Sequence, residues 1–309
     1  MTAVARPAGA MSVADVGRFE HERPRLVGLA YRLLGSVADA EDVVQEAWLR
    51  WQQTDRGAIE QPAAWLTTVT SRIGLDRLRA RQRDRADYVG PWLPEPIVVP
   101  MDTADPAHHA ELSDSLTTAF LVLLEELSPT ERLVLLLADV FDQPFAEISA
   151  ILGRSSEACR QLASRARRKV RAAEAPRRGR GGAVDPAALA AAGAFVDAAR
   201  RGDQQAILEL LAPDAVLVSD GGAEQHAARR PVVGADRVSR FVLNLARRLP
   251  AGVAVAPCWV NGAPGYAAWF RGVPAFIQAF EVEDGRITRI SIVSNPDKLH
   301  GLDHPVELA

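Results

Sequence analysis

The chain has 309 residues, 48% of them hydrophobic, and its 36 basic and 39 acidic side chains leave a formal net charge of −3. This composition excludes a disordered chain and a small disulfide-stabilised domain, and the length predicts two or three folded domains. The cysteines, Cys159 and Cys258, are too few and too far apart for a disulfide framework or a metal site, so we expect a reducing compartment, the cytoplasm. The longest mainly apolar run, Leu133 to Val140, is far shorter than a membrane span.

The N-terminal part of the chain predicts a disordered tail followed by a helical domain. Residues 1–17 are assigned to the tail, whose first eleven residues lack the apolar core of a signal peptide. Helical patterns then cover residues 19–34, 37–51 and 62–85, with Gly35 and Pro62 where a helix end and a helix start are expected. We assign residues 18–87 to this domain.

The segment that begins at Ser36 predicts an amphipathic helix with two different faces. Ser36 followed three residues later by Asp39 is a capping signal. At about 100° per residue, one side of the helix is apolar and the opposite side is charged. The apolar side comprises Val37, Ala40, Val44, Ala47 and Trp51, and the charged side comprises Asp39, Asp42, Glu46 and Arg50. The first side predicts core packing, whereas the second offers carboxylates to solvent or to a partner.

The helix after Pro62 contains one carboxylate among its arginines. Asp76 projects to the side of Val69 and Ile73, and Arg72 and Arg79 lie one turn away on either side. We interpret Asp76 as a partly buried carboxylate in a structural ion pair. On the preceding helix, Trp48 and Trp51 are assigned to packing rather than to stacking on nucleic-acid bases.

The middle of the chain predicts an extended linker and a second helical domain. Residues 88–112 form the linker, because the four prolines between Pro91 and Pro100 prevent a helix. Residues 113–174 form the domain, which ends in a helix-turn-helix with its turn at Gly153. Residues 154–180 hold ten basic and two acidic side chains, which predicts a polyanion as partner.

The C-terminal part changes to an α+β pattern. A second linker, residues 175–185, precedes a domain over residues 186–309, in which residues 187–211 predict two helices divided at Gly202 and residues 237–249 a third. Strands are predicted over residues 216–219, 254–260, 265–271, 275–283 and 287–294. The fold class is therefore multidomain, with two all-α domains followed by an α+β domain.

Several motifs, in this order and spacing, resemble the extracytoplasmic-function (ECF) sigma factors of RNA polymerase. They are Asp39-Ala-Glu-Asp-Val-Val-Gln-Glu46-Ala-Trp48, Pro62-Ala-Ala-Trp65-Leu, the basic helix of residues 72–83, Leu127-Ser-Pro-Thr-Glu131-Arg and the helix-turn-helix. Residues 92–96 (Trp-Leu-Pro-Glu-Pro), 220–222 (Asp-Gly-Gly) and 295–299 (Asn-Pro-Asp-Lys-Leu) further resemble the subgroup with a C-terminal SnoaL-like (NTF2-like) cone domain, the SigJ-like proteins. In one departure, Ala223-Glu224 stands where the subgroup's glycine-rich motif ends in Gly-Lys.

The resemblance implies core RNA polymerase and promoter DNA as partners. The first domain would bind the polymerase clamp and the minus-10 element, and the second would bind the polymerase flap and the minus-35 element. The implied clamp contacts are Asp39, Asp42, Gln45, Glu46 and Trp48. The implied minus-10 contacts are Arg72, Arg77, Arg81 and Arg83. The implied minus-35 contacts are Arg154, Ser155, Ser156, Arg160, Gln161, Ser164, Arg165 and Arg168.

The resemblance also implies control of transcription by the C-terminal domain. This domain would dock on the first linker and hold the two DNA-binding domains in one relative orientation. The residues assigned to that contact are Trp92, Leu93, Pro94, Glu95, Pro96, Asp220, Gly221, Gly222, Asn295, Pro296, Asp297, Lys298 and Leu299.

Two other functions are compatible with the sequence. A one-component DNA-binding regulator with a ligand-sensing domain needs the helix-turn-helix but not the acidic helix face. A SnoaL-like isomerase or cyclase needs a carboxylate or histidine in an apolar pocket, for which Asp220, His226, Tyr266, Trp259 and Trp269 are candidates by residue type alone. Because no pair among them has a persuasive spacing, we expect no enzymatic activity, no cofactor and no metal, while a small-molecule ligand in the C-terminal cavity stays open.

Overall fold

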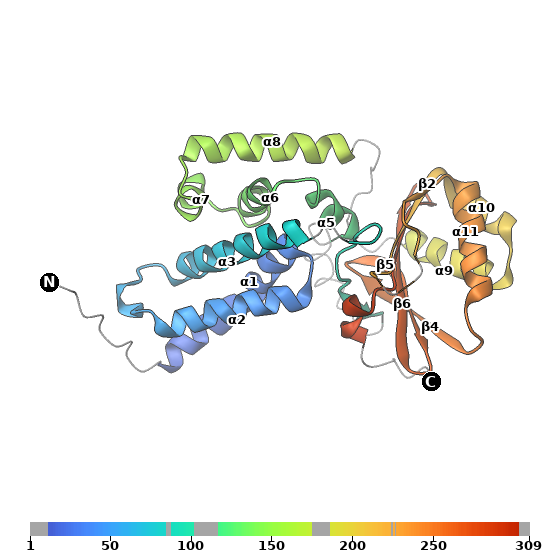
Figure 1. Cartoon of the computed structure of the whole chain (residues 1–309), viewed down its shortest axis with the longest axis horizontal. Coiled ribbons are helices and arrows are strands. Elements are labelled where there is room, and N and C mark those ends of the chain that lie inside the picture. Colours follow the sequence, from blue (N-terminus) through green and yellow to red (C-terminus); the bar gives the residue numbers. More distant parts are fainter. Residues whose placement is uncertain are drawn as a thin grey trace. The chain divides into compact units, whose positions relative to one another are not determined.

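The computed structural model describes residues 12–84, 88–101, 117–174, 186–223, 225 and 227–302. The chain forms two compact units, which are coloured by sequence in Figure 1. The first unit consists of Met1–Ala86 and Leu124–Ala172, and the second of Asp87–Leu123 and Ala173–Ala309. Helical elements therefore make up the first unit, whereas the proline-rich linker belongs with the C-terminal α+β domain.

Three long helices form one half of the first unit. Helices α1 (Val13–Leu34), α2 (Val37–Gln53) and α3 (Pro62–Asp84) pack against one another, and the short helix η1 (Arg56–Ala58) lies between α2 and α3 in the chain. Gly35 ends α1 with a φ of 69°, a left-handed conformation that suits glycine, and the Ser36 hydroxyl caps α2. On the predicted apolar face of α2, Val37 is half-buried and the other four residues are buried, with Trp51 in the core of this bundle.

The predicted disordered tail is wrong for its last residues, because α1 already begins at Val13. Ser12 accepts a hydrogen bond from the Asp15 main-chain N–H, and the Asp15 side chain accepts one from the Ser12 N–H. This capping box satisfies main-chain groups that the start of a helix otherwise leaves unpaired. Residues 1–11 lie outside the described part of the chain.

The other half of the first unit contains the helix-turn-helix. It is built from α6 (Pro129–Leu135), the π-helical turn η3 (Leu136–Val140), α7 (Phe145–Leu152) and α8 (Ser156–Glu174). Ser128 and Glu131 form a capping box before α6, and Gly153 ends α7 with a φ of 63°. The predicted turn at Gly153 is therefore confirmed.

The second unit is built on a mixed sheet. In sheet order its strands are β1 (Val98–Pro100), β4 (Val253–Val260), β5 (Ala263–Phe270), β6 (Val273–Glu283), β7 (Arg286–Val293), β2 (Leu211–Asp220) and β3 (Val232–Val233). The other elements are α5 (Thr118–Leu124), α9 (Pro186–Arg201), α10 (Gln204–Leu210), α11 (Ala235–Arg248), η4 (Pro296–Lys298) and η5 (His300–Leu302). The predicted α+β fold of this region is confirmed.

Each face of the sheet has its own core. Phe195, Phe280 and Ile290 belong to the core on the face that α9 and α11 cover. The opposite core contains Trp269 and Ile277 from the sheet, and it also contains Leu93 of the linker and Leu299 of the C-terminal turn. The linker thus supplies part of the second layer that shields the sheet from water.

The sequence did not predict that the linker contributes a strand. Val98, Val99 and Pro100 pair antiparallel with β4, opposite Val260, Trp259 and Cys258. A segment of three residues is too short to show the periodicity of a strand. Its final proline is tolerated because this strand lies at the edge of the sheet. Pairing with β4 therefore decides its conformation.

Among the helices that the structure describes, none is both long enough and apolar enough to cross a bilayer.

Burial makes both cysteines poor nucleophiles. Cys159 and Cys258 are 0% and 4% exposed, and burial raises the pKa of both thiols, that of Cys258 to about 12. A raised thiol pKa keeps the reactive thiolate scarce at neutral pH. We expect the folded protein to react slowly with excess thiol reagent at about pH 8 and the urea-unfolded protein to react rapidly at both positions. Fast reaction of either cysteine in the folded protein would contradict the packing described above.

Candidate polymerase and nucleic-acid interfaces

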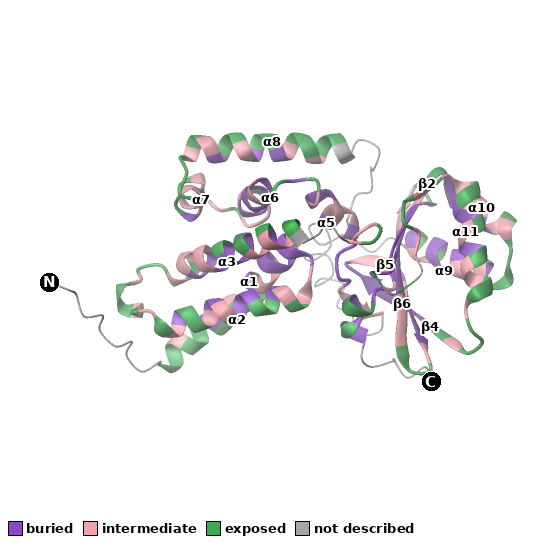
Figure 2. Ribbon diagram, in the orientation of Figure 1, coloured by how far each residue is buried: buried purple, intermediate pink, exposed green. Residues whose placement is uncertain are grey.

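The outward side of α8 presents a row of basic and polar side chains. Cys159, Ala163 and Ala166 are completely buried on its inner side, and the outer side is exposed in Figure 2. The exposed candidates are Arg154, Ser155, Arg160, Gln161, Ser164, Arg165 and Arg168. Helical periodicity therefore brings nearly the whole predicted minus-35 set to one surface.

The two serines at the start of α8 have structural contacts. The Ser155 hydroxyl accepts a hydrogen bond from the Ala158 N–H at 3.1 Å, and the half-buried Ser156 hydroxyl donates to the Phe145 carbonyl at 3.4 Å. Arg160 stacks over the Phe145 ring, with 5.7 Å between the guanidinium carbon and the ring centroid. These contacts orient the N-terminal end of α8 on α7.

Two further basic residues fasten α8 to the rest of the helix-turn-helix. Arg167 donates two hydrogen bonds to Asp139, at 2.8 and 2.5 Å, and the carboxylate raises the pKa of Arg167. Lys169 donates a hydrogen bond to Glu131 at 2.7 Å. Burial alone would raise the pKa of Glu131. The hydrogen bonds from Lys169 and Ser128 together outweigh that effect, so the pKa of Glu131 is lowered. Part of the arginine-rich run therefore stabilises the fold.

The acidic face of α2 is the candidate polymerase surface. Asp42 and Gln45 are exposed, Asp39 and Glu46 are half-buried, and Trp48 packs against Phe19 with ring centroids 4.6 Å apart. The tryptophan contact agrees with its predicted packing role. The carboxylates are accessible along one side of the helix, as the sequence indicated.

The structure places predicted DNA contacts against that acidic face. Arg77 lies 3.3 Å from Asp42 and 3.8 Å from Glu46, and Arg81 lies 3.6 Å from Asp39. Side chains that the sequence assigned to two different partners thus pair with each other. Arg83, by contrast, lies on the exposed side of α3.

Arg72 is exposed, and its guanidinium joins α3 to α7. Its Nε and Nη2 atoms donate to the main-chain carbonyls of Ile151 and Ala150, at 3.0 and 2.8 Å. A cation at the C-terminal end of a helix is favourable, since unpaired carbonyls concentrate negative charge there.

A second arginine joins the two halves of the first unit in its interior. Arg132 of α6 is 1% exposed and donates to the Arg32 carbonyl from Nε at 3.1 Å and from Nη2 at 2.8 Å. It also pairs with Glu125 at 2.5 Å. Burial lowers the pKa of the Arg32 side chain to about 10, so Arg32 stays protonated at neutral pH.

The interpretation of Asp76 as a partly buried carboxylate is wrong. Its side chain is 77% exposed, and it pairs on the surface with Arg79 at 3.3 Å. Packing of α3 buries Ile73 and Leu78, and this orientation leaves Asp76 facing solvent.

In the second unit, a buried ion pair attaches the linker to the sheet. Asp220, at the end of β2, is 1% exposed and accepts hydrogen bonds from Lys298 Nζ at 2.6 Å, the Tyr88 hydroxyl at 2.5 Å, the Leu93 N–H at 2.8 Å and the Gly222 N–H at 3.0 Å. Lys298 also donates to the Leu93 carbonyl at 2.6 Å. We call these five residues the linker clasp.

Aromatic rings and an asparagine complete the linker clasp. Lys298 Nζ lies 4.4 Å from the Trp92 ring centroid and 5.2 Å from that of Tyr88, within the range of cation–π attraction. Asn295 Nδ2 donates to the Tyr88 hydroxyl at 3.1 Å. The structure thus brings together the three motifs that the sequence proposed for this contact, and it adds Tyr88, which no sequence signal distinguished.

Other members of the predicted interdomain set differ in their burial. Pro94, Glu95, Pro96 and Leu299 are buried, while Pro296 and Asp297 are exposed in the turn that carries Lys298. Lys298, from the motif of residues 295–299, supplies the cation beside Asp220. The glycine-rich motif that begins at Asp220 is the one that departs from the subgroup, at residues 223–224. Glu224 lies outside the described residues.

The catalytic candidates that lie within the described residues do not converge on one site. Asp220 is held in the linker clasp, Trp269 belongs to the same sheet face, and Tyr266 packs in the opposite core, where burial raises its pKa. Trp259 is buried on β4, and His226 lies outside the described residues.

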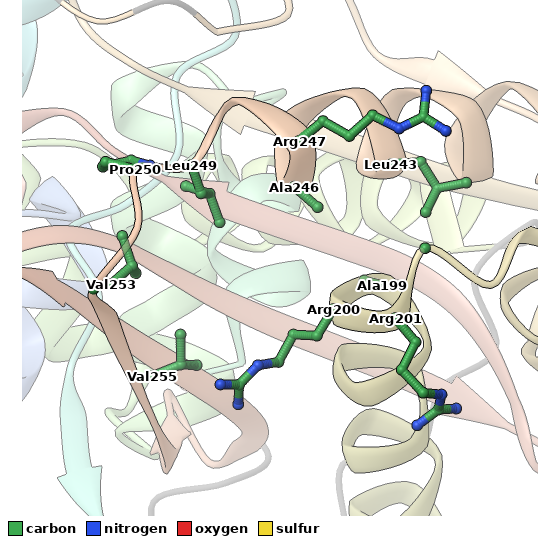
Figure 3. A pocket seen from close by; sticks show the side chains of 12 residues that line it. Ala199, Arg200, Arg201, Leu243, Ala246, Arg247, Leu249, Pro250, Val253 and Val255 are labelled. Carbon is green, nitrogen blue, oxygen red and sulfur yellow. The ribbon is translucent and has the colours of Figure 1, made fainter.

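A surface pocket of about 390 Å³ lies at the ends of α9 and α11. Its lining combines Arg200, Arg201 and Arg247 with apolar side chains such as Leu249 and Val255, and in Figure 3 the three arginines point in different directions. Within the described part of the chain, this lining contains no carboxylate, imidazole or thiol. General acid–base chemistry normally requires such a group.

Removing the cation of the linker clasp should release the linker. In Lys298→Met, Asp220 would remain buried without its cation, a change that typically costs about 3–5 kcal/mol. We expect chymotrypsin to cleave at Tyr88 and Trp92 about 100-fold faster or more than in the wild type. Asp220→Asn combined with Lys298→Met should recover part of the protection, and an unchanged cleavage rate in Lys298→Met would show that the ion pair does not hold the linker.

Gly222 tests the close approach of Asn295 to the linker clasp. A Cβ at Gly222 would lie 2.7 Å from Asn295 Cγ, whereas one at Gly252 would have no atom within 4 Å; both glycines have positive φ, +62° and +89°. Gly252→Ala should lose about 1 kcal/mol of unfolding free energy, from backbone strain alone. Gly222→Ala should lose about 1–3 kcal/mol more, because of overpacking. Equal losses in calorimetry would contradict the tight contact.

Comparison with known proteins identifies the family. Sigma-70 region 2 matches residues 18–84, and Sigma-70, region 4 matches residues 117–170. The ECF RNA polymerase sigma factor SigJ of Mycobacterium tuberculosis is 42% identical over 296 residues, which cover 93% of this chain and 94% of the relative. The probable ECF RNA polymerase sigma factor SigI of the same species is 35% identical, over 91% of this chain and 93% of its own length.

A solved structure agrees with this result. The crystal structure of the Mycobacterium tuberculosis extracytoplasmic function sigma factor SigJ matches with a TM-score of 0.73 and 40% identity, covering 93% of this chain and 98% of that chain. The match extends through the helical elements and the C-terminal sheet. The chain therefore belongs to the family of extracytoplasmic-function RNA polymerase sigma factors.

Proposed function

We propose that this protein binds core RNA polymerase, recognises the minus-10 and minus-35 promoter elements and starts transcription in the cytoplasm. The observation that carries the proposal is the exposed basic side of α8 in a helix-turn-helix, joined in one unit to a helix with an exposed acidic side. A DNA-binding regulator that acts alone would need only the first of these surfaces. A chain that bridges DNA and a basic protein surface needs both.

The acidic face of α2 would bind the polymerase clamp. Asp39, Asp42 and Glu46 offer carboxylates along one side of the helix, and Gln45 lies beside them. Charge complementarity with a basic surface favours rapid and specific association. Trp48 would act mainly by packing on Phe19, which fixes the orientation of the helix.

The exposed side of α8 would bind the minus-35 element. Arg160 and Gln161, exposed near its N-terminal end, would read base edges, where a good bidentate contact gives about 1–3 kcal/mol of discrimination. Arg165 and Arg168, further along the same side, suit phosphate contacts that set the register.

The two halves of the first unit would have to separate on promoter DNA. The two elements lie roughly 25 base pairs apart, which at about 3.4 Å per base pair is some 85 Å. The contact of Arg72 with the end of α7 instead holds α3 and α7 within hydrogen-bonding distance. The described packing thus fits a resting form of the sigma factor.

The C-terminal domain would control this separation through the linker clasp. If the clasp opened, residues 88–101 would become available as about 45 Å of extended chain, at roughly 3.3 Å per residue. Because the linker and the sheet belong to one chain, even a weak contact has a high effective concentration. In this proposal the C-terminal domain acts without catalysis, since Asp220 is fully engaged by Lys298 and the linker.

Run-off transcription with core polymerase, on a promoter selected from a random library, tests the proposal. Wild-type protein should give promoter-dependent transcript, and reversal of Asp39, Asp42 and Glu46 to lysine should reduce it at least tenfold by weakening polymerase binding. Replacing Arg165 and Arg168 with glutamine should instead weaken DNA binding and lower its salt dependence. Specific DNA binding without any transcript would favour a one-component regulator.

A further inference from the structure

Arginines of α3 neutralise part of the acidic face of α2. Arg77 is 35% exposed and bridges Asp42 at 3.3 Å and Glu46 at 3.8 Å. Arg81 is 22% exposed and lies 3.6 Å from Asp39, while it also donates to the Leu34 carbonyl. Each carboxylate proposed to bind the polymerase therefore has an internal cation beside it.

The sequence spacing of the two helices produces this match. Arg77 and Arg81 are four residues apart on α3, and Asp39, Asp42 and Glu46 recur at intervals of three and four on α2, so each set lies along one helix side. Because α2 and α3 pack against each other, the two sides meet. Arg50 adds a pair with Glu46 from within α2, at 2.6 Å.

We propose that Arg77 and Arg81 occupy the acidic face in the free protein and are displaced from it by basic side chains of the polymerase. The displaced arginines then become available to DNA phosphates. Polymerase binding and DNA binding by this half of the first unit are consequently coupled and favour each other. This inference rests on the proposed function and adds to it a coupling between the binding of its two partners.

The coupling is reciprocal, as any coupling of two binding equilibria must be. When DNA phosphates bind Arg77, the Asp42 and Glu46 carboxylates lose this internal cation and can bind the polymerase. When the polymerase binds those carboxylates, Arg77 is released and can bind DNA. In the free protein, the carboxylates of α2 therefore weaken DNA binding by Arg77 and Arg81.

The effect is modest because the pairs are open to water. The Asp42 and Glu46 side chains are 71% and 39% exposed, and ion pairs of this kind contribute little in high-dielectric surroundings. We therefore expect each substitution to change an affinity about two- to fivefold. The change should shrink as salt is raised, since counterions screen exposed charges.

Core polymerase binding by full-length variants is the deciding measurement. Arg77→Gln removes the cation beside Asp42 and leaves Glu46 with Arg50, whereas Arg79→Gln, on the same helix, frees only Asp76 elsewhere on the surface. Both variants lose one positive charge, so the comparison removes the effect of net charge. Arg77→Gln should bind core polymerase about two- to fivefold more tightly than Arg79→Gln at low salt.

DNA binding without polymerase supplies the reciprocal measurement. Asp42→Asn removes a partner of Arg77, while Glu41→Gln removes one negative charge at the exposed neighbouring position of α2. Asp42→Asn should bind fluorescent promoter DNA about two- to fivefold more tightly than Glu41→Gln. Circular dichroism of all four variants checks that the helices remain folded.

The possible outcomes separate the two proposals. Equal polymerase affinities of Arg77→Gln and Arg79→Gln, or a weaker affinity for Arg77→Gln, would overturn the coupling while leaving the sigma-factor function intact. Failure of the wild-type protein and of Arg79→Gln to bind core polymerase would overturn the proposed function itself, and the coupling with it. Tighter binding in both Arg77→Gln and Asp42→Asn, each against its control, would support the coupling.

Discussion

The buried ion pair between Lys298 and Asp220 is the contact on which the second unit depends. Its two side chains come from the C-terminal turn and from the end of β2, and each also binds the main chain of Leu93 in the linker. Buried charges are tolerated only when they are paired and hydrogen-bonded. The Asp220 carboxylate and the Lys298 ammonium therefore each need the other charge and the hydrogen bonds of the linker. Together with Leu93 in the core and β1 on the sheet edge, this contact makes the linker a structural layer of the C-terminal domain.

Arginine plays a comparable role in the first unit. Arg72 donates hydrogen bonds to two main-chain carbonyls of another helix, and Arg132 donates two to a single carbonyl. Arg167 donates to both carboxylate oxygens of Asp139 from Nε and Nη2, which lie on one edge of its guanidinium. The planar guanidinium suits such paired contacts better than an ammonium does. An arginine-rich sequence in this family therefore serves packing as well as nucleic-acid binding, and a count of basic residues overstates the charge offered to DNA.

The sequence predicted much of the fold and which side chains lie along each helix face. The two faces of α2, the turn at Gly153 and the outward row on α8 all followed from helical spacing and capping residues, and all are present. The errors concern contacts between elements. Asp76 points to solvent, and Val98–Pro100 becomes a strand because β4 lies beside it.

By itself, the sequence determined the family, the order of the elements and the side chains that each helix presents on its two sides. Periodicity, caps and turn residues act over a few neighbouring residues, so these features can be recognised without coordinates. Only the tertiary structure decided that Arg77 faces Asp42, that Tyr88 joins Asp220 and that the linker completes a sheet. Those outcomes depend on how separate elements pack, and an ion pair between residues far apart in the chain exists only where packing brings both charges within a few ångströms.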